Sequence, residues 1–457
     1  MSIKDLICRY HYETQKKPTF QFPKWCLAVA LLLLTANSHA QDLTPADTVG
    51  QSYAEALSRT YNSTNAQFLA TLKTKTDNRK LLKYYQSRFK EIFKTLNEKI
   101  NERQVIYIPE ISGTLENILQ EIKKNNPAIP KDIEVLLLRE DLPNAYSLGN
   151  NSVFVNLGLF YYMKSEDQVA TVLCHEIGHL LMEHTLQALQ YSYERDKQST
   201  TEVKSLRETE LRKADRAFEL LRNSIYKEGE VKREHEIEAD SMGYLLFKNT
   251  RYDKAAFMEA LKIIEPYDTL RYDGLKEETY KRFFDLPNQK FKDGWLKPED
   301  FSSYNYSAFT EKLNDDSVAS HPAVRARIQH LKSVFPELAQ QQDTLIIVVA
   351  PEFARMQSIA EKQRLPNLFF NERYGEVIYL ALLHLQEDAD SALYAQWLGK
   401  GFQKIYEARH DYKLNKYLDR VAPKEQTKSY ITFLSFMWNL KLDEIEKIAS
   451  YYNQSGT

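Results

Sequence analysis

Residues 165–181 read SEDQVATVLCHEIGHLL, and this stretch predicts one long helix that is largely buried. Ser165 stands three positions before Gln168, which is the spacing of a capping box at the start of a helix. Apolar residues then follow on one broad face up to the end of the stretch. His175 and His179 are four positions apart, so the helix would place both imidazoles on the same face. The stretch therefore predicts a helix that presents two histidines to a shared partner.

Glu176 completes the pattern His-Glu-x-x-His between these two histidines. Two imidazoles at this spacing can bind one zinc ion, with the carboxylate turned toward a water molecule on the metal. Such a carboxylate can take a proton from the water as it attacks a peptide carbonyl, and later deliver it to the leaving amine. We therefore predict one Zn²⁺ per chain, bound by His175 and His179, with Glu176 as general base. A pair of ordinary helix histidines is disfavoured, because these groups would be costly to bury without partners.

A catalytic zinc ion takes three protein ligands, so a third has to be found. The metzincin pattern would place a histidine six residues after His179, but that position is Thr185. His184 is five residues after His179 and is rotated off the metal-facing side of the helix, so we assign it a structural role. The third ligand is therefore expected elsewhere in the chain.

The charge-rich stretch at residues 233–240 offers the candidates. Glu236 and Asp240 would share a helix face, so one could bind zinc while the other accepts the free N–H of a ligating histidine. Glu234 and Glu238 form a competing pair, and His235 could also bind metal. Spacing alone favours Glu236 but leaves these alternatives open.

Several blocks of sequence, in the same order along the chain, resemble the gluzincin peptidases of family M48. This family includes HtpX, BepA, LoiP, the Oma-type mitochondrial proteases and the CAAX prenyl endopeptidases. The resemblance covers about residues 105 to 335. The blocks that carry it are Asn144–Gly149, Val153–Leu159, Glu166–Asp167, His175–His179, Glu236–Asp240 and Ser320–Pro322, followed by Arg327.

The resemblance implies roles that the spacing does not give. It implies Glu236 as the third zinc ligand and Asp240 as the partner of a ligating histidine. It places His321 near the metal, either as a movable fourth ligand or as a stabiliser of the tetrahedral intermediate, with Arg327 beside it. Without the resemblance, His321 would be interpreted as a surface residue before a proline-started helix. The predicted catalytic residues are therefore Glu176, His321 and Arg327.

The resemblance also implies how a substrate binds. Val153, Phe154, Val155 and Asn156 fit the exposed edge strand along which such proteases lay an extended polypeptide. Prenylated substrates are not expected, because family members that act within membranes carry several transmembrane helices. After the N-terminal apolar run, this sequence has no run of the roughly twenty apolar residues that a transmembrane helix requires.

The fold class predicted from the sequence is α+β, mainly α. The chain has only 13 Gly and 15 Pro in 457 residues, which favours long helices over many tight turns. Residues 133–138 and 152–156 have strand-like patterns and predict a small sheet. We expect a signal peptide at 1–40, a helical segment at 41–104, a zincin-like metallopeptidase domain at 105–335 and a helical domain at 340–457. This last domain is either tetratricopeptide-like or a plain helical cap.

The N-terminal residues 1–40 have the pattern of a signal peptide. A basic stretch precedes the apolar run Trp25–Leu34, and Ser38 and Ala40 are small residues suited to a signal peptidase. We expect cleavage after Ala40, with an uncleaved anchor as the alternative. The protein is then exported, to the periplasm or envelope or as a secreted protein. The mature chain would have no transmembrane segment, which leaves peripheral membrane association open.

Charge and cysteine content exclude two further classes. The formal charge is −2, and removal of residues 1–40 makes it −5, so a basic nucleic-acid-binding protein is not expected. Of the three cysteines only Cys174 follows Ala40, so the mature chain cannot form an intramolecular disulfide.

These features together predict an exported zinc endopeptidase in envelope protein quality control. Its substrates would be polypeptides, including misfolded envelope proteins, and its C-terminal helices would recruit protein partners. The alternative is a proteolytically quiet chaperone or scaffold in envelope assembly, in which zinc only staples the fold.

Overall fold

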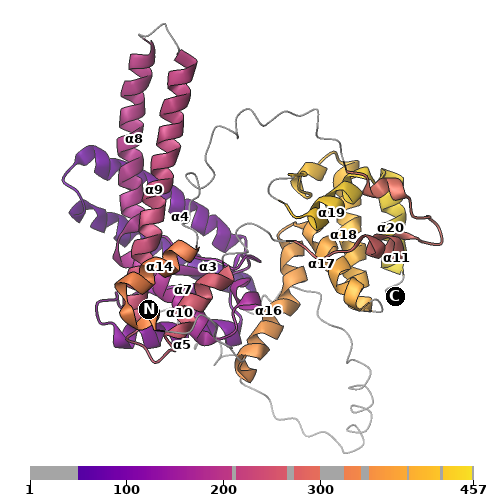
Figure 1. The fold of residues 1–457 in the computed structure, drawn as a ribbon, viewed down its shortest axis with the longest axis horizontal. Helices are drawn as coiled ribbons and strands as arrows, with labels where there is room; N and C mark the ends of the chain where they lie inside the picture. The colour runs from indigo at the N-terminus through magenta and orange to yellow at the C-terminus, as the bar shows by residue number, and fades with distance from the viewer. Residues whose placement is uncertain are drawn as a thin grey trace, which may run out of the picture.

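The computed structural model describes residues 50–207, 213–264, 272–298, 324–340, 349–388, 391–422 and 426–454. In these residues the protein is mainly helical (Figure 1). It has one small four-stranded sheet. The predicted α+β, mainly α class is therefore confirmed. The predicted signal peptide lies outside the described residues. No helix in the described ranges is both long enough and apolar enough to cross a membrane.

The sheet has the strand order β1-β2-β4-β3. Its strands are β1 (Val105–Ile106), β2 (Glu134–Leu138), β3 (Ala145–Ser147) and β4 (Ser152–Asn156). β2 and β4 are parallel, whereas the β1–β2 and β3–β4 pairs are antiparallel.

The sheet order corrects one prediction from the sequence. The strand that contains Val153, Phe154, Val155 and Asn156 is not an edge strand, because β4 pairs with β2 on one side and with β3 on the other. All five residues of β4 are buried. The hairpin from β3 to β4 covers the side of β4 that the prediction leaves open, so the open edge on this side of the sheet belongs to β3.

Two helical layers cover the sheet. On one face, Leu137, Val153 and Val155 pack in one core with α5 (Pro109–Asn125) and α7 (Glu166–Leu181). On the other face, Leu136 and Phe154 pack with α3 (Gly50–Thr71) and α4 (Arg79–Asn101). Because side chains alternate between the two faces of a strand, β2 and β4 contribute to both cores. The helices α3 and α4 thus support the sheet on the face opposite α7.

A long helical hairpin projects from the core around the sheet (Figure 1). It is formed by α8 (His184–Arg207) and α9 (Lys213–Phe247), whose bases lie against α7. Around the same core lie α6 (Leu159–Tyr162), α10 (Ala255–Ile264), α14 (Val324–Val334) and α15 (Pro336–Ala339), and the 3-10 turn η1 (Leu72–Thr74) lies between α3 and α4.

The helix α16 (Pro351–Phe370) connects the catalytic core to a second, helical core, as Figure 1 shows. Its Phe353 and Met356 pack in the first core, and its Leu365 and Leu368 pack in the second. The second core is built by α11 (Glu277–Phe284), η3 (Asp293–Leu296), α17 (Tyr374–Glu387), α18 (Ala392–His410), η5 (Leu414–Lys416), α19 (Lys428–Asn439) and α20 (Leu442–Gln454).

Residues 272–298 belong to the second core, although the sequence analysis placed them within the domain at 105–335. Tyr280, Phe284 and Trp295 are buried there against residues of the C-terminal helices such as Phe436. The apolar area of these aromatic rings explains the difference, because the helices α17 to α20 offer the surface that buries them. The helical C-terminal domain therefore includes a segment from the middle of the chain, and its likeness to tetratricopeptide repeats stays a prediction.

Candidate metal centre

The metal centre depends on the close approach of α7 and α9. A Cβ atom added to Gly178 of α7 would lie 2.7 Å from the backbone oxygen of Ala239, and one added to Gly243 of α9 would lie 2.9 Å from the Cα atom of His175. Real Cβ atoms do not approach backbone so closely, so both positions require glycine. The two glycines let the backbones of α7 and α9 touch at the level of His175.

Three side chains from these two helices converge on one point. The ligand atoms of His175, His179 and Glu236 all lie within 4.8 Å of one another. The Nε2 atoms of the two histidines are 3.1 Å apart, and the Glu236 carboxylate lies 3.6 Å from His175 Nε2 and 3.5 Å from His179 Nε2. Two imidazoles and one carboxylate form the donor set of a catalytic zinc site that leaves a fourth position open. These residues therefore fit a zinc ion.

The competing candidates on α9 lie elsewhere. The Glu234 side chain is exposed. Glu238 Oε2 lies 3.0 Å from His184 Nε2, and His235 Nε2 lies 3.1 Å from Gln187 Oε1. Among the alternatives that the spacing left open, the structure thus brings Glu236 to the two histidines.

Asp240 contacts His175 at Nδ1, on the opposite side of the ring from the cluster, and Arg327 contacts Asp240. The Asp240 carboxylate is 1% exposed and lies 3.0 Å from His175 Nδ1. Arg327 donates two hydrogen bonds of 2.7 Å to the same carboxylate, through Nε and Nη2. A ring whose Nδ1–H is bound in this way presents Nε2 to a metal ion. Asp240 has the place that the sequence predicted, and Arg327 of α14 contacts it directly.

Burial and neighbouring charges shift the pKa values of the two histidines in opposite directions. Burial disfavours the charged form of His175, but contacts with Asp240 and Glu236 outweigh it and raise the pKa to about 10. Burial, together with the neighbouring His175, lowers the pKa of His179 to about 3. Metal ligation requires an unprotonated Nε2 on both rings, so protons compete with a metal ion for this cluster.

Glu176 lies beside the cluster on α7 and is 8% exposed. Burial raises its pKa to about 7, and the charge of Glu236 adds to the rise, whereas His175, a hydrogen bond with the Ser147 side chain and Arg327 lower it. A carboxylate with a pKa near neutrality can both accept and return a proton at neutral pH. Glu176 thus has the environment of a general base and acid.

The part of the chain that holds this cluster matches a known protein family. The family model of peptidase family M48 matches residues 109–334, which include the sheet, α7 and α9. Residues 109–334 belong to peptidase family M48. M48 peptidases depend on zinc, and membership indicates a metallopeptidase. The resemblance seen in the sequence is therefore confirmed.

One relative in this family shares a short segment with the chain. Over 56 residues the chain is 38% identical to the mitochondrial metalloendopeptidase OMA1 of Arabidopsis thaliana. The segment covers 12% of this chain and 12% of that protein. The chain thus matches a small part of its relative's length, and the match carries no substrate or partner with it.

His184 of the M48 domain makes a contact that sequence reasoning missed. The α7 helix ends at Leu181, Glu183 has a positive φ of 56°, and α8 starts afresh at His184. This break turns the His184 ring back toward the cluster, where its Nδ1 lies 2.8 Å from His179 Nδ1. His184 is not part of the ligand cluster, and a helical wheel continued from α7 does not show its contact with His179. The positive φ of Glu183 carries no clear signal in the sequence.

His321, the remaining predicted catalytic residue of the M48 domain, lies outside the described residues, as do Ser320 and Pro322. Its role stays a prediction that the family resemblance carries.

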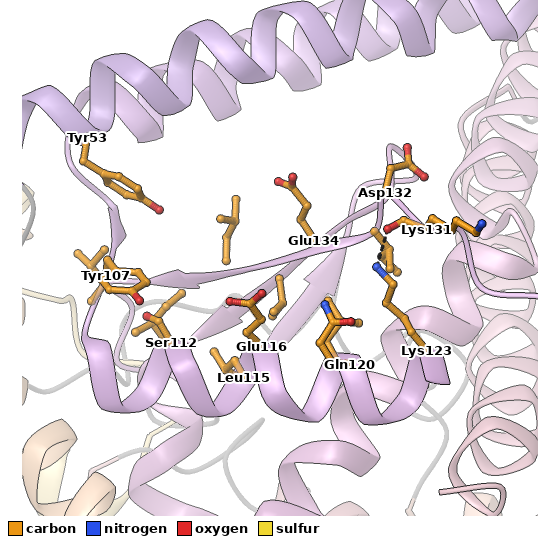
Figure 2. A pocket seen from close by; sticks show the side chains of 16 residues that line it. Tyr53, Tyr107, Ser112, Leu115, Glu116, Gln120, Lys123, Lys131, Asp132 and Glu134 are labelled. Carbon is orange, nitrogen blue, oxygen red and sulfur yellow. Dashed lines mark hydrogen bonds between the residues drawn. The ribbon is translucent and has the colours of Figure 1, made fainter. Parts of the chain in front are cut away.

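A separate cavity of about 430 Å³ lies between α3, β2 and α5 (Figure 2). Tyr53, Glu116 and Glu134 are among the side chains that line it, and none of the metal-cluster residues does. This cavity is therefore not the predicted catalytic site.

Proposed function

We propose that the chain is an exported, zinc-dependent endopeptidase that hydrolyses peptide bonds of protein substrates. One observation carries the proposal: His175, His179 and Glu236 converge within 4.8 Å, and Glu176 lies beside them on the same helix as the two histidines. The family membership of residues 109–334 supports the same chemistry.

The chain's own residues divide the work of such a reaction. A zinc ion held by His175, His179 and Glu236 would supply a Lewis acid that polarises the scissile carbonyl and makes a water molecule more acidic. Glu176 accepts the proton of the attacking water and passes it to the leaving nitrogen of the peptide bond. Asp240 and Arg327 keep His175 in the orientation that binding requires.

An extended substrate would pair with β3. Within the described residues β3 pairs with β4 and with no other strand. Asn156 N–H donates to the Asn144 oxygen, so the alternation of the ladder turns the backbone of Ala145 and Ser147 toward the open edge. The Ala145 N–H is taken by Asn144 Oδ1, which leaves Ser147 to pair with a substrate. Ser147 also contacts Glu176, so a peptide on this edge would run past the general base.

The cellular setting belongs to the same proposal. The basic and apolar pattern of residues 1–40 supports export, to the periplasm or envelope or out of the cell. There the enzyme would act on misfolded envelope proteins, and the helical C-terminal domain would recruit clients or partner proteins.

His321 would act at the same centre, in one of two ways. As a fourth ligand it would block the water position, and His321→Ala would raise proteolysis. As a stabiliser of the tetrahedral intermediate it would assist, and the same substitution would lower proteolysis.

The test uses residues 41–457 and unfolded casein. Glu176→Gln should lower cleavage by roughly 10²- to 10⁴-fold, because it removes the proton acceptor. The zinc content of Glu176→Gln should stay at about one ion per chain, because the three ligands are unchanged. Glu234→Gln is the matched control, since Glu234 is an exposed glutamate outside the cluster. Undiminished cleavage by Glu176→Gln would refute the mechanism. If no zinc-loaded form cleaves casein, including the His321→Ala variant, the result would favour a scaffold in which zinc only staples the fold.

A further inference from the structure

His184 occupies a buried position directly behind a zinc ligand. It is the first residue of α8 and is 4% exposed. Its Nδ1 lies 2.8 Å from Nδ1 of His179, and its Nε2 lies 3.0 Å from Oε2 of Glu238 on α9. Three side chains from three helices thus form one line of contacts that starts at His179.

Only one arrangement of protons satisfies this line when His179 binds a metal. His179 faces the other ligands with Nε2, so that nitrogen has to be unprotonated and Nδ1 carries the hydrogen. The Nδ1–H of His179 then donates to Nδ1 of His184. This leaves the hydrogen of neutral His184 on Nε2, from which it donates to the Glu238 carboxylate. Each nitrogen and the carboxylate oxygen in the line therefore has a matching partner.

Neighbouring side chains fix the plane of the His184 ring. The ring of His235 stacks on it, with 4.2 Å between centroids and 10° between planes. Gln187 Oε1 in turn lies 3.1 Å from His235 Nε2. Because it is stacked on one face and hydrogen-bonded at both nitrogens, the His184 ring has little freedom to turn away from His179.

We propose that His184, oriented by Glu238, is a positioning residue that fixes the tautomer and orientation of the zinc ligand His179. The proposal rests on the function proposed above, because it takes His179 to be a metal ligand. It gives His179 the counterpart of what Asp240 does for His175. The two supports differ, since Asp240 is a buried carboxylate held by Arg327, whereas Glu238 is 48% exposed in its side chain.

The test is zinc affinity, measured by competition with a chromophoric chelator on residues 41–457. His184→Phe keeps a stacking ring and removes both hydrogen bonds. Loss of such a partner weakens metal binding by roughly 10- to 100-fold, and we expect this for His184→Phe. His184→Asn places an amide oxygen near the position of Nδ1, so it should rescue affinity to within about threefold of the wild type. Glu234→Gln again serves as the control on α9.

A spectroscopic measurement separates positioning from packing. With Co²⁺ in place of zinc, the visible absorption bands report the ligand geometry. They should shift in His184→Phe and return toward the wild-type bands in His184→Asn. Should His184→Phe fail to fold, Glu238→Ala tests the same line from its exposed end, and its zinc affinity should fall by several-fold.

Two results would overturn the proposal. One is wild-type zinc affinity and wild-type cobalt bands in the folded His184→Phe or Glu238→Ala protein. The other is equal weakening in the phenylalanine and asparagine variants, which would mean that His184 only fills space. Failure of the proposed function itself has a different signature, because then the wild-type chain binds no zinc or cleaves casein without Glu176.

Discussion

Gly243 of α9 touches the backbone of His175 on α7, so closely that a Cβ atom on this glycine would lie 2.9 Å from the His175 Cα atom. This contact sets the distance between the two helices that supply the ligands. It makes the packing of α7 on α9, and not only the ligand side chains, a condition for metal binding.

Gly243→Ala should therefore destabilise the protein and weaken zinc binding together. Alanine in a helix gains up to about 1 kcal/mol over glycine, but the forced separation of packed helices costs about 1–3 kcal/mol. Urea unfolding and zinc competition measure the two effects. Gly113→Ala in α5 is the control, since its Cβ would meet nothing within 4 Å, and it should stabilise the chain slightly. Unchanged zinc affinity in Gly243→Ala would contradict the role of the close contact.

Arg327→Met should strongly destabilise the metal-free chain. It would leave the Asp240 carboxylate, which is 1% exposed, without its bidentate partner. Breaking such a buried pair costs about 3–5 kcal/mol. The exposed Arg325 on the same helix provides the control substitution. Adding Asp240→Asn should restore part of the stability, because an amide is less costly to bury than a charge. No loss in urea unfolding would show that the pair is not a structural support.

Glu444→Gln tests how residues 272–298 are held by the C-terminal helices. The buried Glu444 carboxylate pairs with Lys292 and accepts a hydrogen bond from Trp295 Nε1 at 3.1 Å. Burial disfavours its charge, but Lys292 and the Lys441 N–H outweigh burial and hold its pKa below the usual value. A carboxylate with a lowered folded-state pKa stabilises the fold above its unfolded pKa, and that stability is lost as the pH falls.

The Glu444→Gln protein should therefore be less stable than the wild type at pH 7 by about 1–3 kcal/mol, and the difference should shrink as the pH falls below about 4.5. Thermal unfolding over a pH series measures this. Asp443→Asn removes a neighbouring surface ion pair with Lys447 and should have no measurable effect. A stability difference that does not change with pH would contradict the assignment.

Peptide substrates methylated at single backbone nitrogens test the β3 edge. A peptide that pairs with Ser147 uses alternate N–H groups, so methylation of those groups removes a ladder hydrogen bond. Each such loss is worth about 1 kcal/mol and should raise KM by roughly five- to tenfold. Methylation of the intervening N–H groups should have little effect on KM. Tolerance at every position would rule out pairing with this strand.

The predicted site residues that the structure brings together from one helix depend on local geometry. His175, Glu176 and His179 lie within two turns of one helix, so the helical period alone places them. Glu236 lies on a different helix; spacing favours it over its acidic neighbours, and the family resemblance is needed to select it. No local pattern encodes the approach of α9 to α7, which Gly178 and Gly243 permit.

The errors have equally physical causes. The family resemblance implies an edge strand at Ser152–Asn156, but neither it nor the alternation of polar and apolar residues shows which strands flank β4, and β4 lies between β2 and β3. The helical wheel keeps His184 off the metal-facing side but does not show its contact with His179, because the chain leaves the helix at Glu183 and begins a new one. Position in the chain places residues 272–298 in the predicted domain at 105–335. Their aromatic side chains instead pack with C-terminal helices such as α19, more than 100 positions later.

The metal centre is tested most directly by anomalous X-ray scattering from crystals of residues 41–457, measured on both sides of the zinc absorption edge. We expect one zinc peak per chain, about 2 Å from the Nε2 atoms of His175 and His179 and from the Glu236 carboxylate. A peak bound by other residues, or no peak in crystals grown with zinc, would contradict it.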